Sequence, residues 1–290
     1  MKIDQTRIAQ QCPCCTNSDL SSSPAILMPF ISHRAFNWTP VEIDDSWGLN
    51  SIKNGYAYSI CNSLLCKKCG FLFLDIRFTD DETSRLYANY REEEYTKLRD
   101  FYEPGYAARN DDLNIGYGQK YVKDIECFLK PHLELPVSIL DWGGDTGKNT
   151  PFKDKNKLFD IYDISNNEPI EEAKIISKEE AYTNEYDLII CSNVLEHVAY
   201  PHKILEEIIP CMDNDSLLYI EVPHENLIIN EKNNLHLKKK HWHEHINFYT
   251  LESLKSLIDN SGLELIDVND LEVTNGTSVW FQFQLACKLK

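Results

Sequence analysis

The chain has 290 residues, of which 42% are hydrophobic and 26% charged. This composition is typical of globular proteins and leaves room for one full α/β domain and a small second module. The formal net charge of −17 and the pI of about 4.9 argue against a nucleic-acid partner, because phosphate backbones are bound by clustered lysine and arginine. No stretch approaches the ~20 uninterrupted apolar residues of a membrane helix, and residues 1–20 contain no apolar signal core. We therefore expect a cytoplasmic protein without a nucleic-acid or membrane partner.

Two cysteine pairs near the N-terminus share the spacing Cys-x-x-Cys. The four residues are Cys12, Cys15, Cys66 and Cys69. Two such pairs can place four thiolates around one Zn²⁺ ion at ~2.3 Å, which closes the tetrahedral site and makes it structural. The alternative is a set of unpaired buried thiols, and Cys14 and Cys61 are spare cysteines that could replace a ligand. We predict a zinc-binding module over residues 1–78.

The segments around the second cysteine pair carry weaker signals. The runs Ile26–Ile31 and Tyr56–Ile60 are predicted to be strands or loops of the module. Residues 79–115 begin as a helix with acids at its N-terminal end, and we predict a helical linker or lid there. Charge alternation favours a solvated connecting helix. In the alternative, Tyr87 and Tyr90 belong to a lid over a cofactor.

Strand and helix patterns alternate over residues 116–290, which we predict to form one α/β domain. The predicted strands are Val137–Asp141, Lys157–Ser165, Ala173–Ile176, Tyr186–Cys191, Leu217–Val222, Leu263–Val268 and Val279–Cys287. The predicted helices are Gly116–Leu133, Ile204–Met212 and Thr250–Ser261. Pro223 is expected to end the fifth strand, and the last two strands are expected to form an edge hairpin. The fold class is therefore a Rossmann-like α/β fold with a seven-stranded, mainly parallel sheet, preceded by the small zinc-binding module.

The first of these strands ends in the turn Asp141-Trp-Gly-Gly-Asp-Thr-Gly147. Only three residues separate Gly143 from Gly147, so the turn is not a phosphate-binding P-loop, and it also lacks the dinucleotide pattern G-x-G-x-x-G. An acid before the glycines suits a cofactor with an ammonium group and no pyrophosphate. Asp163, about 20 residues further on at the end of the second strand, is placed to bind ribose hydroxyls.

Together with Tyr162–Ser165 and Asn193–Val198, this turn resembles the class I S-adenosylmethionine-dependent methyltransferases. The resemblance covers about residues 110–290. It implies that the glycine turn binds the methionine end of the cofactor, that Asp163 binds the ribose and that the Asn193 loop borders the reaction pocket. The implied cofactor-binding residues are Asp141, Gly143, Gly144, Asp145, Gly147, Asp163, Ile164 and Asn193.

A second unusual stretch is His241-Trp-His-Glu-His245. Strand-like alternation would put its three histidines on one face. One interpretation is a metal site, and another is a surface patch without function. The third is acid–base chemistry, because methyl transfer needs a positioned acceptor and removal of its proton, for which a histidine oriented by a carboxylate is suited.

The cysteine pairs and this stretch together resemble sugar C-methyltransferases that act on nucleotide-linked deoxysugars. In that resemblance Trp242, His243, Glu244 and His245 match the segment that lines the acceptor pocket, with the Glu-His pair abstracting a proton. His197 matches the family's loop histidine, and Trp242 stands where the family has tyrosine.

From the resemblance we expect S-adenosylmethionine-dependent methyl transfer to carbon or oxygen of a small, sugar-linked acceptor, with structural Zn²⁺ as a second bound group. His245 is the expected base, Glu244 orients it, and His197 is the second candidate. One alternative is O- or N-methylation of another small metabolite without a strong base. Another is a non-catalytic scaffold that binds partners through the zinc module.

Overall fold

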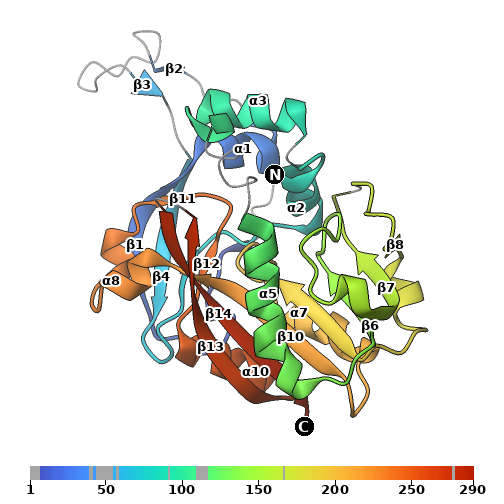
Figure 1. The fold of residues 1–290 in the computed structure, drawn as a ribbon. Helices are drawn as coiled ribbons and strands as arrows, with labels where there is room; N and C mark the ends of the chain where they lie inside the picture. Colours follow the sequence, from blue (N-terminus) through green and yellow to red (C-terminus); the bar gives the residue numbers. More distant parts are fainter. Residues whose placement is uncertain are drawn as a thin grey trace.

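The computed structural model describes residues 7–38, 42–43, 55–56, 59–90, 92–108, 117–165, 167–275 and 278–290. These residues form a five-stranded sheet, a seven-stranded sheet and a two-stranded pair of β2 (Glu42–Ile43) with β3 (Gly55–Tyr56) (Figure 1). Part of the predicted segment Tyr56–Ile60 lies outside the described residues. Within the described part of the chain, no helix is long and apolar enough to cross a bilayer.

The five-stranded sheet has the order β11-β1-β4-β5-β12. Its strands are β1 (Leu20–Leu27), β4 (Ser59–Cys66), β5 (Leu72–Leu74), β11 (His241–Trp242) and β12 (Asn247–Phe248). Both edge strands thus come from the predicted α/β domain rather than from the N-terminal module. The division of the chain at residues 78 and 115 stays a prediction, but in space the N-terminal sheet is completed by residues 241–248.

Helices pack against the apolar side chains of this sheet. They are α1 (Pro29–Phe36), α2 (Asp80–Tyr87) and α3 (Glu93–Tyr102), grouped at one end of the molecule (Figure 1). The helix predicted after residue 79 is confirmed, because Thr79 and Glu82 form a capping box that satisfies its first N–H groups. The strand or loop predicted over Ile26–Ile31 is wrong in its second half. Pro29 opens α1 there, since proline lacks the N–H that a first helical turn leaves unpaired.

The seven-stranded sheet has the order β13-β14-β10-β9-β6-β7-β8, as a Rossmann-like α/β fold with an edge hairpin requires. Its strands are β6 (Val137–Trp142), β7 (Asn156–Tyr162), β8 (Lys174–Ile175), β9 (Leu188–Ser192), β10 (Leu217–His224), β13 (Leu263–Asn275) and β14 (Ser278–Leu289). β14 runs antiparallel to β10, whereas β6 to β10 run parallel.

The predicted end of the fifth strand at Pro223 is wrong, because β10 continues to His224. Pairing of β10 with β9 stops at Glu221, whereas pairing with β14 continues, with Pro223 opposite Gln282. On its open side the proline has no ladder hydrogen bond to lose.

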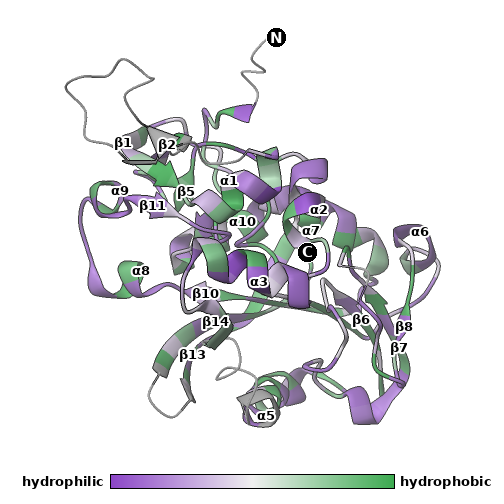
Figure 2. Cartoon of the chain, turned by 90° about the horizontal axis from the view of Figure 1, so that it is seen from above, coloured by the Kyte–Doolittle hydropathy of each residue, from purple (hydrophilic) through white to green (hydrophobic). Residues whose placement is uncertain are grey.

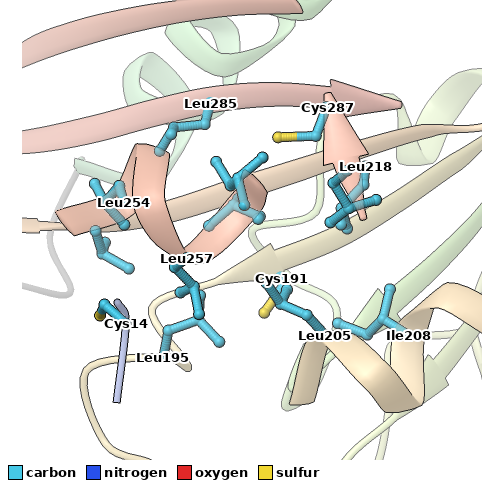
Figure 3. Packing of buried hydrophobic residues seen from close by; sticks show 14 of the residues in the cluster. Cys14, Cys191, Leu195, Leu205, Ile208, Leu218, Leu254, Leu257, Leu285 and Cys287 are labelled. Carbon is cyan, nitrogen blue, oxygen red and sulfur yellow. The ribbon is translucent and has the colours of Figure 1, made fainter. Parts of the chain in front are cut away.

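Successive side chains of the central strands point to opposite faces of the large sheet and pack into two separate hydrophobic cores. Ile139, Ile190 and Tyr219 face α5 (Tyr117–Leu129), which crosses the front of the sheet in Figure 1. Their neighbours face α7 (Pro201–Ile208) and α10 (Leu251–Asn260) on the other side, where Cys191, Leu218, Leu205 and Leu257 pack together (Figure 3). Figure 2 shows hydrophobic residues along central strands such as β6 and hydrophilic residues on the short rim helix α6 (Lys178–Ala181).

Short helices complete the fold. They are α8 (Asn226–Asn230), α9 (Leu235–Lys238) and the 3-10 turns Lys130–His132, Lys153–Lys155 and Ile209–Cys211. α8 and α9 lie between β10 and β11, so the chain passes from the carboxyl end of the large sheet to the edge of the small sheet within seventeen residues, 225–241. This connection places the histidine-rich segment beside the large sheet.

Candidate active site

Four cysteine thiols from residues 12–15 and 66–69 meet beside the start of α10. Cys12, Cys15, Cys66 and Cys69 are buried, and their sulfur atoms all lie within 4.8 Å of one another. The Sγ atoms of Cys12 and Cys69 are 3.6 Å apart and those of Cys15 and Cys66 are 3.5 Å apart. Such separations exclude disulfides and approach the ~3.8 Å between thiolates that are each ~2.3 Å from a tetrahedral zinc ion. Cys14 and Cys61 are buried but lie outside this group.

The glycine turn after β6 is built so that the backbone folds tightly over the strand ends. Gly143 has a φ of 84° and donates its N–H to the carbonyl of Tyr162 at 2.7 Å. A Cβ at Gly143 would lie 2.5 Å from a Val194 methyl carbon, and one at Gly144 would lie 2.5 Å from the carboxyl carbon of Asp141. Gly147 also has positive φ, 76°. A side chain at any of these three positions would displace neighbouring side chains, and Gly143 and Gly147 also have the positive φ that favours glycine.

Asp141 lies beneath this turn at the end of β6 and is 5% exposed. Its Oδ2 accepts a hydrogen bond from the Thr150 hydroxyl. Burial raises the pKa of Asp141 to about 7, against the lowering effect of Thr150, and the nearby charges of Asp163 and Asp145 raise it further. A cationic group bound above the turn would relieve this unfavourable charge.

Asp163 follows β7 directly and lies beside the glycine turn. Its carboxylate accepts the backbone N–H of Asp145 at 2.8 Å and that of Ser165 at 2.6 Å. Asp145 adopts a left-handed conformation with φ of 51°, which points its N–H at Asp163. The carboxylate of Asp145 accepts hydrogen bonds from the side chains of Asn167 at 2.6 Å and Ser165 at 3.2 Å. Next to Asp163, Ile164 is 44% exposed and offers an apolar surface at the strand end.

Asn193 follows β9, but its side chain is engaged with the sheet. Its Nδ2 donates to Glu221 Oε1 at 3.0 Å, and its Oδ1 accepts from Gln282 at 3.3 Å. Burial raises the pKa of Glu221 to about 8, although a hydrogen bond from Gln284 lowers it. Asn193 therefore shapes the loop after β9 through a buried carboxyl group.

The histidine-rich segment does not have the alternation that the sequence predicts. β11 ends at Trp242, and the chain is irregular until β12 begins at Asn247. His241 is exposed, whereas the rings of His243 and His245 lie 4.9 Å apart. Trp242 is fully buried and donates its indole N–H to the Ser63 hydroxyl at 2.8 Å.

A different carboxylate from the predicted one faces His245. Its Nδ1 lies 2.7 Å from Glu225 Oε1, and Glu225 follows β10. Glu244 instead accepts from the Arg99 guanidinium at 2.5 Å, and its other oxygen lies 3.4 Å from His243 Nδ1. The predicted orientation of His245 by Glu244 is thus replaced by one from Glu225. Glu244 and His245 stay close to each other on this irregular backbone, with one ligand atom of each within 4.8 Å of the other, but Glu244 is held by Arg99.

The charges around these two residues determine their protonation. Burial alone would lower the pKa of His245, but the hydrogen bond to Glu225 and the charge of Glu196 raise it above its usual value. Burial would raise the pKa of Glu244, but the contact with His243 and the charge of Arg99 hold it well below its usual range.

His197 and Glu196 complete the cluster on the loop after β9. The ring of His197 lies 4.8 Å from that of His245. Its Nδ1 is 2.7 Å from the Tyr87 hydroxyl and 3.1 Å from the Glu244 carbonyl. Burial, with His245 nearby, lowers the pKa of His197 to about 3, so the ring is neutral. Burial raises the pKa of Glu196, which is 1% exposed, to about 7.

The cofactor-type residues, His197 and Glu225 lie at the same edge of the large sheet, because they are at or just beyond the carboxyl ends of the parallel strands β6, β7, β9 and β10. His245 comes from the segment between β11 and β12 and reaches this edge through its contacts with Glu225 and His197. The residues not singled out from the sequence are Glu196, Glu225 and Arg99. Glu225 carried the same signal as Asp163, an acid just beyond a buried strand. Arg99 carried none, since only the folded chain brings it to Glu244.

A family model described as a methyltransferase domain matches residues 87–268. C-methyltransferase NovU of Streptomyces niveus is 32% identical over 85 residues, which are 29% of this chain and 19% of NovU. The match thus spans about a fifth of that relative's length.

Among solved structures, the 1,6-didemethyltoxoflavin-N1-methyltransferase of Burkholderia thailandensis is 17% identical with a TM-score of 0.45, covering 68% of this chain and 90% of that one. Magnesium protoporphyrin IX methyltransferase of Synechocystis PCC 6803 is 13% identical with a TM-score of 0.42, covering 63% and 87%.

Proposed function

The chain belongs to the methyltransferase domain family, and from this premise we propose that it transfers a methyl group from S-adenosylmethionine to a small, sugar-linked acceptor. The observation that carries the proposal is the meeting of two groups at one sheet edge: the glycine turn with Asp141 and Asp163, and the cluster around His245. The family match over residues 87–268 includes both groups.

The residues at the ends of β6 and β7 fit an adenosyl cofactor. Asp141 is buried and its pKa is raised, so the ammonium group of the amino-acid tail would stabilise its charged form. Asp163 has two carboxylate oxygens beside the turn and would accept from the ribose hydroxyls, with Ile164 beside the base. When bound, the cofactor supplies a methyl group on a positively charged sulfur.

The histidine cluster would bind and deprotonate the acceptor. If His245 donates its Nδ1 proton to the Glu225 carboxylate, its Nε2 is left unprotonated and can take a proton from the acceptor. Glu225 thereby takes the orienting role that the sequence assigned to Glu244. Neutral His197 is the second candidate, and Glu244 fixes the loop through Arg99.

The acceptor that we propose is a nucleotide-linked or otherwise glycosylated small molecule, methylated at carbon or oxygen. The partial likeness to a C-methyltransferase supports carbon. A carbon acid needs a strong, well-oriented base, which the His245–Glu225 pair provides, whereas an O- or N-methylation would tolerate its loss.

We also propose that the four-cysteine cluster binds Zn²⁺. Four buried thiols with no position left for a further ligand fit a structural ion. The ion would tie the Cys12 turn to the loop between β4 and β5, and the Cys69 carbonyl accepts the Thr250 hydroxyl at the start of α10. The zinc module would thus help to fix the position of Thr250, which follows the histidine-rich segment in the chain.

The test is transfer of labelled methyl groups from S-adenosylmethionine to a panel of nucleotide-linked sugars and other hydroxylated metabolites, followed by assignment of the methylated atom. We expect label in at least one sugar-linked acceptor, and much less with Asp163→Asn protein. Binding of the cofactor without transfer to any acceptor would favour a scaffold, and no binding at millimolar concentration would contradict the proposal altogether.

A further inference from the structure

Glu196 is a buried carboxylate without a partner. Its side chain is 1% exposed, and within the described part of the chain neither carboxylate oxygen takes part in a hydrogen bond. Burial of an unsatisfied charged group is costly, so such groups are normally paired or bind a metal ion. The nearest ring nitrogen, His197 Nε2, is 3.6 Å from Glu196 Oε1, too far for a hydrogen bond.

Both histidines beside Glu196 have a hydrogen-bonding partner at their Nδ1 atoms. His197 Nδ1 lies 2.7 Å from the Tyr87 hydroxyl and 3.1 Å from the Glu244 carbonyl, and when it donates its proton to that carbonyl its Nε2 has the free lone pair. His245 Nδ1 faces the Glu225 carboxylate at 2.7 Å, which leaves its Nε2 free in the same way. An imidazole whose second nitrogen donates to a carboxylate or carbonyl is the usual arrangement of a metal-binding histidine.

One ligand atom each from Glu196, His197 and His245 lies within 4.8 Å of the other two. Two ligands that are each ~2.1 Å from a tetrahedral ion are ~3.4 Å apart, close to the 3.6 Å between Glu196 and His197. Two imidazoles and one carboxylate suit a divalent ion such as Zn²⁺, Mn²⁺ or Fe²⁺ and leave coordination positions open.

We infer that Glu196, His197 and His245 bind a divalent cation whose open positions take oxygen atoms of the methyl acceptor. This inference rests on the proposed function and goes beyond it. The cation would polarise the acceptor oxygen and so lower the pKa of the acceptor proton, which solvent water would take up, while His245 would act as a ligand of the cation rather than as the base. The site is separate from the four-cysteine cluster and differs in donor type, because that cluster offers only thiolates.

The donor types make the two sites distinguishable in the full-length protein. Purified protein is stripped of metal, reconstituted with Co²⁺ and followed by absorption and elemental analysis. We expect two equivalents per chain, of which only one gives thiolate-to-cobalt charge-transfer absorption. Glu196→Gln and His245→Ala should each lose the Co²⁺ ion that is not bound by thiolates. Both variants should keep the thiolate absorption, which also shows that the variant is folded. Glu179→Gln, at an exposed glutamate on α6, is the matched control and should bind two equivalents.

A single equivalent with thiolate absorption in all four proteins would overturn the inference. If labelled methyl transfer persists in that case, the proposed function stands with His245 as base. Two equivalents in the native protein and one in both site variants, without methyl transfer to any acceptor, would support the cation site and contradict the proposed function.

Discussion

The cofactor end and the acceptor end of the site are assembled in different ways. The residues of the cofactor end all lie between Asp141 and Ile164, at the carboxyl ends of two adjacent parallel strands. The acceptor end combines side chains from α2, α3, the loops after β9 and β10 and the segment between β11 and β12. The first end is thus set by local chain geometry, whereas the second exists only once the two sheets are joined.

This comparison predicts that damage to the small sheet reaches the acceptor end. Cys66→Ser should abolish zinc binding and unfold the N-terminal sheet, because a structural zinc site contributes ~10–16 kcal/mol of binding free energy, as much as the whole stability of a domain. The measurements are metal content and thermal unfolding. Cys127→Ser, at an exposed cysteine, is the matched control and should behave like the native protein. Full zinc content in Cys66→Ser would remove this residue from the metal site.

Within the acceptor end itself, loss of His245 should reduce methyl transfer most. We expect His245→Ala to lower methyl transfer by ~10²–10⁴ while cofactor affinity is unchanged, because the ring contacts only the acceptor side. Labelled-methyl assays with parallel calorimetry check both quantities. Unchanged turnover would exclude His245 from the chemistry.

Substitutions of the two glutamates beside this histidine should differ in their effects on turnover and on stability. Glu225→Gln is expected to lower turnover by ~10–10² with little change in stability, since it weakens the group that orients the ring. Glu244→Gln removes one of the two carboxylates that Arg99 contacts, the other being Glu103, and should cost ~1.5–3 kcal/mol of unfolding free energy. Denaturant unfolding and turnover measured on both variants separate the effects. The reverse pattern would restore Glu244 as the orienting residue.

At the cofactor end, Asp163→Asn should weaken binding of S-adenosylhomocysteine by ~10–10², because one charge-assisted hydrogen bond is worth ~1.5–3 kcal/mol. Asp160→Asn is the comparison, since Asp160 lies on β7, is buried and accepts hydrogen bonds from Tyr186 and Asn184, which precede β9. That change should affect stability and leave affinity nearly unchanged. Equal affinity in both variants would contradict the ribose assignment.

Replacement of Asp141 should change the stability by an amount that depends on pH. Its pKa is about 7 in the folded chain against 3.8 ordinarily. The folded state therefore binds the extra proton between about pH 4 and 7, and this contribution to stability is lost as pH rises through that range. Asp141→Asn should raise the unfolding free energy at pH 8 by about 2–4 kcal/mol, change it little at pH 4, and weaken cofactor binding. Equal stability at pH 8 would show that burial does not perturb this group.

The sequence was sufficient where one segment determines its own neighbours. The apolar runs of β6 and β9 and the helix predicted over Thr250–Ser261 matched those elements closely. The sequence was not sufficient where the neighbouring strand determines how far a strand extends. Pro223 stays within β10 because β14 continues to pair with β10 there. The face assigned to His241, His243 and His245 was wrong because β11 has only two residues. The partner of His245 could not be read from spacing, since Glu225 is twenty residues away.

The central claim is that an adenosyl cofactor binds across the ends of β6 and β7 with its reactive end toward the histidine cluster. A crystal structure of the full chain with S-adenosylhomocysteine tests it most directly. The account predicts the ribose hydroxyls on the Asp163 carboxylate, the amino group near Asp141, and the sulfur pointing to the cluster of His197 and His245. A ligand bound elsewhere, or a side chain filling that place in the presence of saturating ligand, would contradict it.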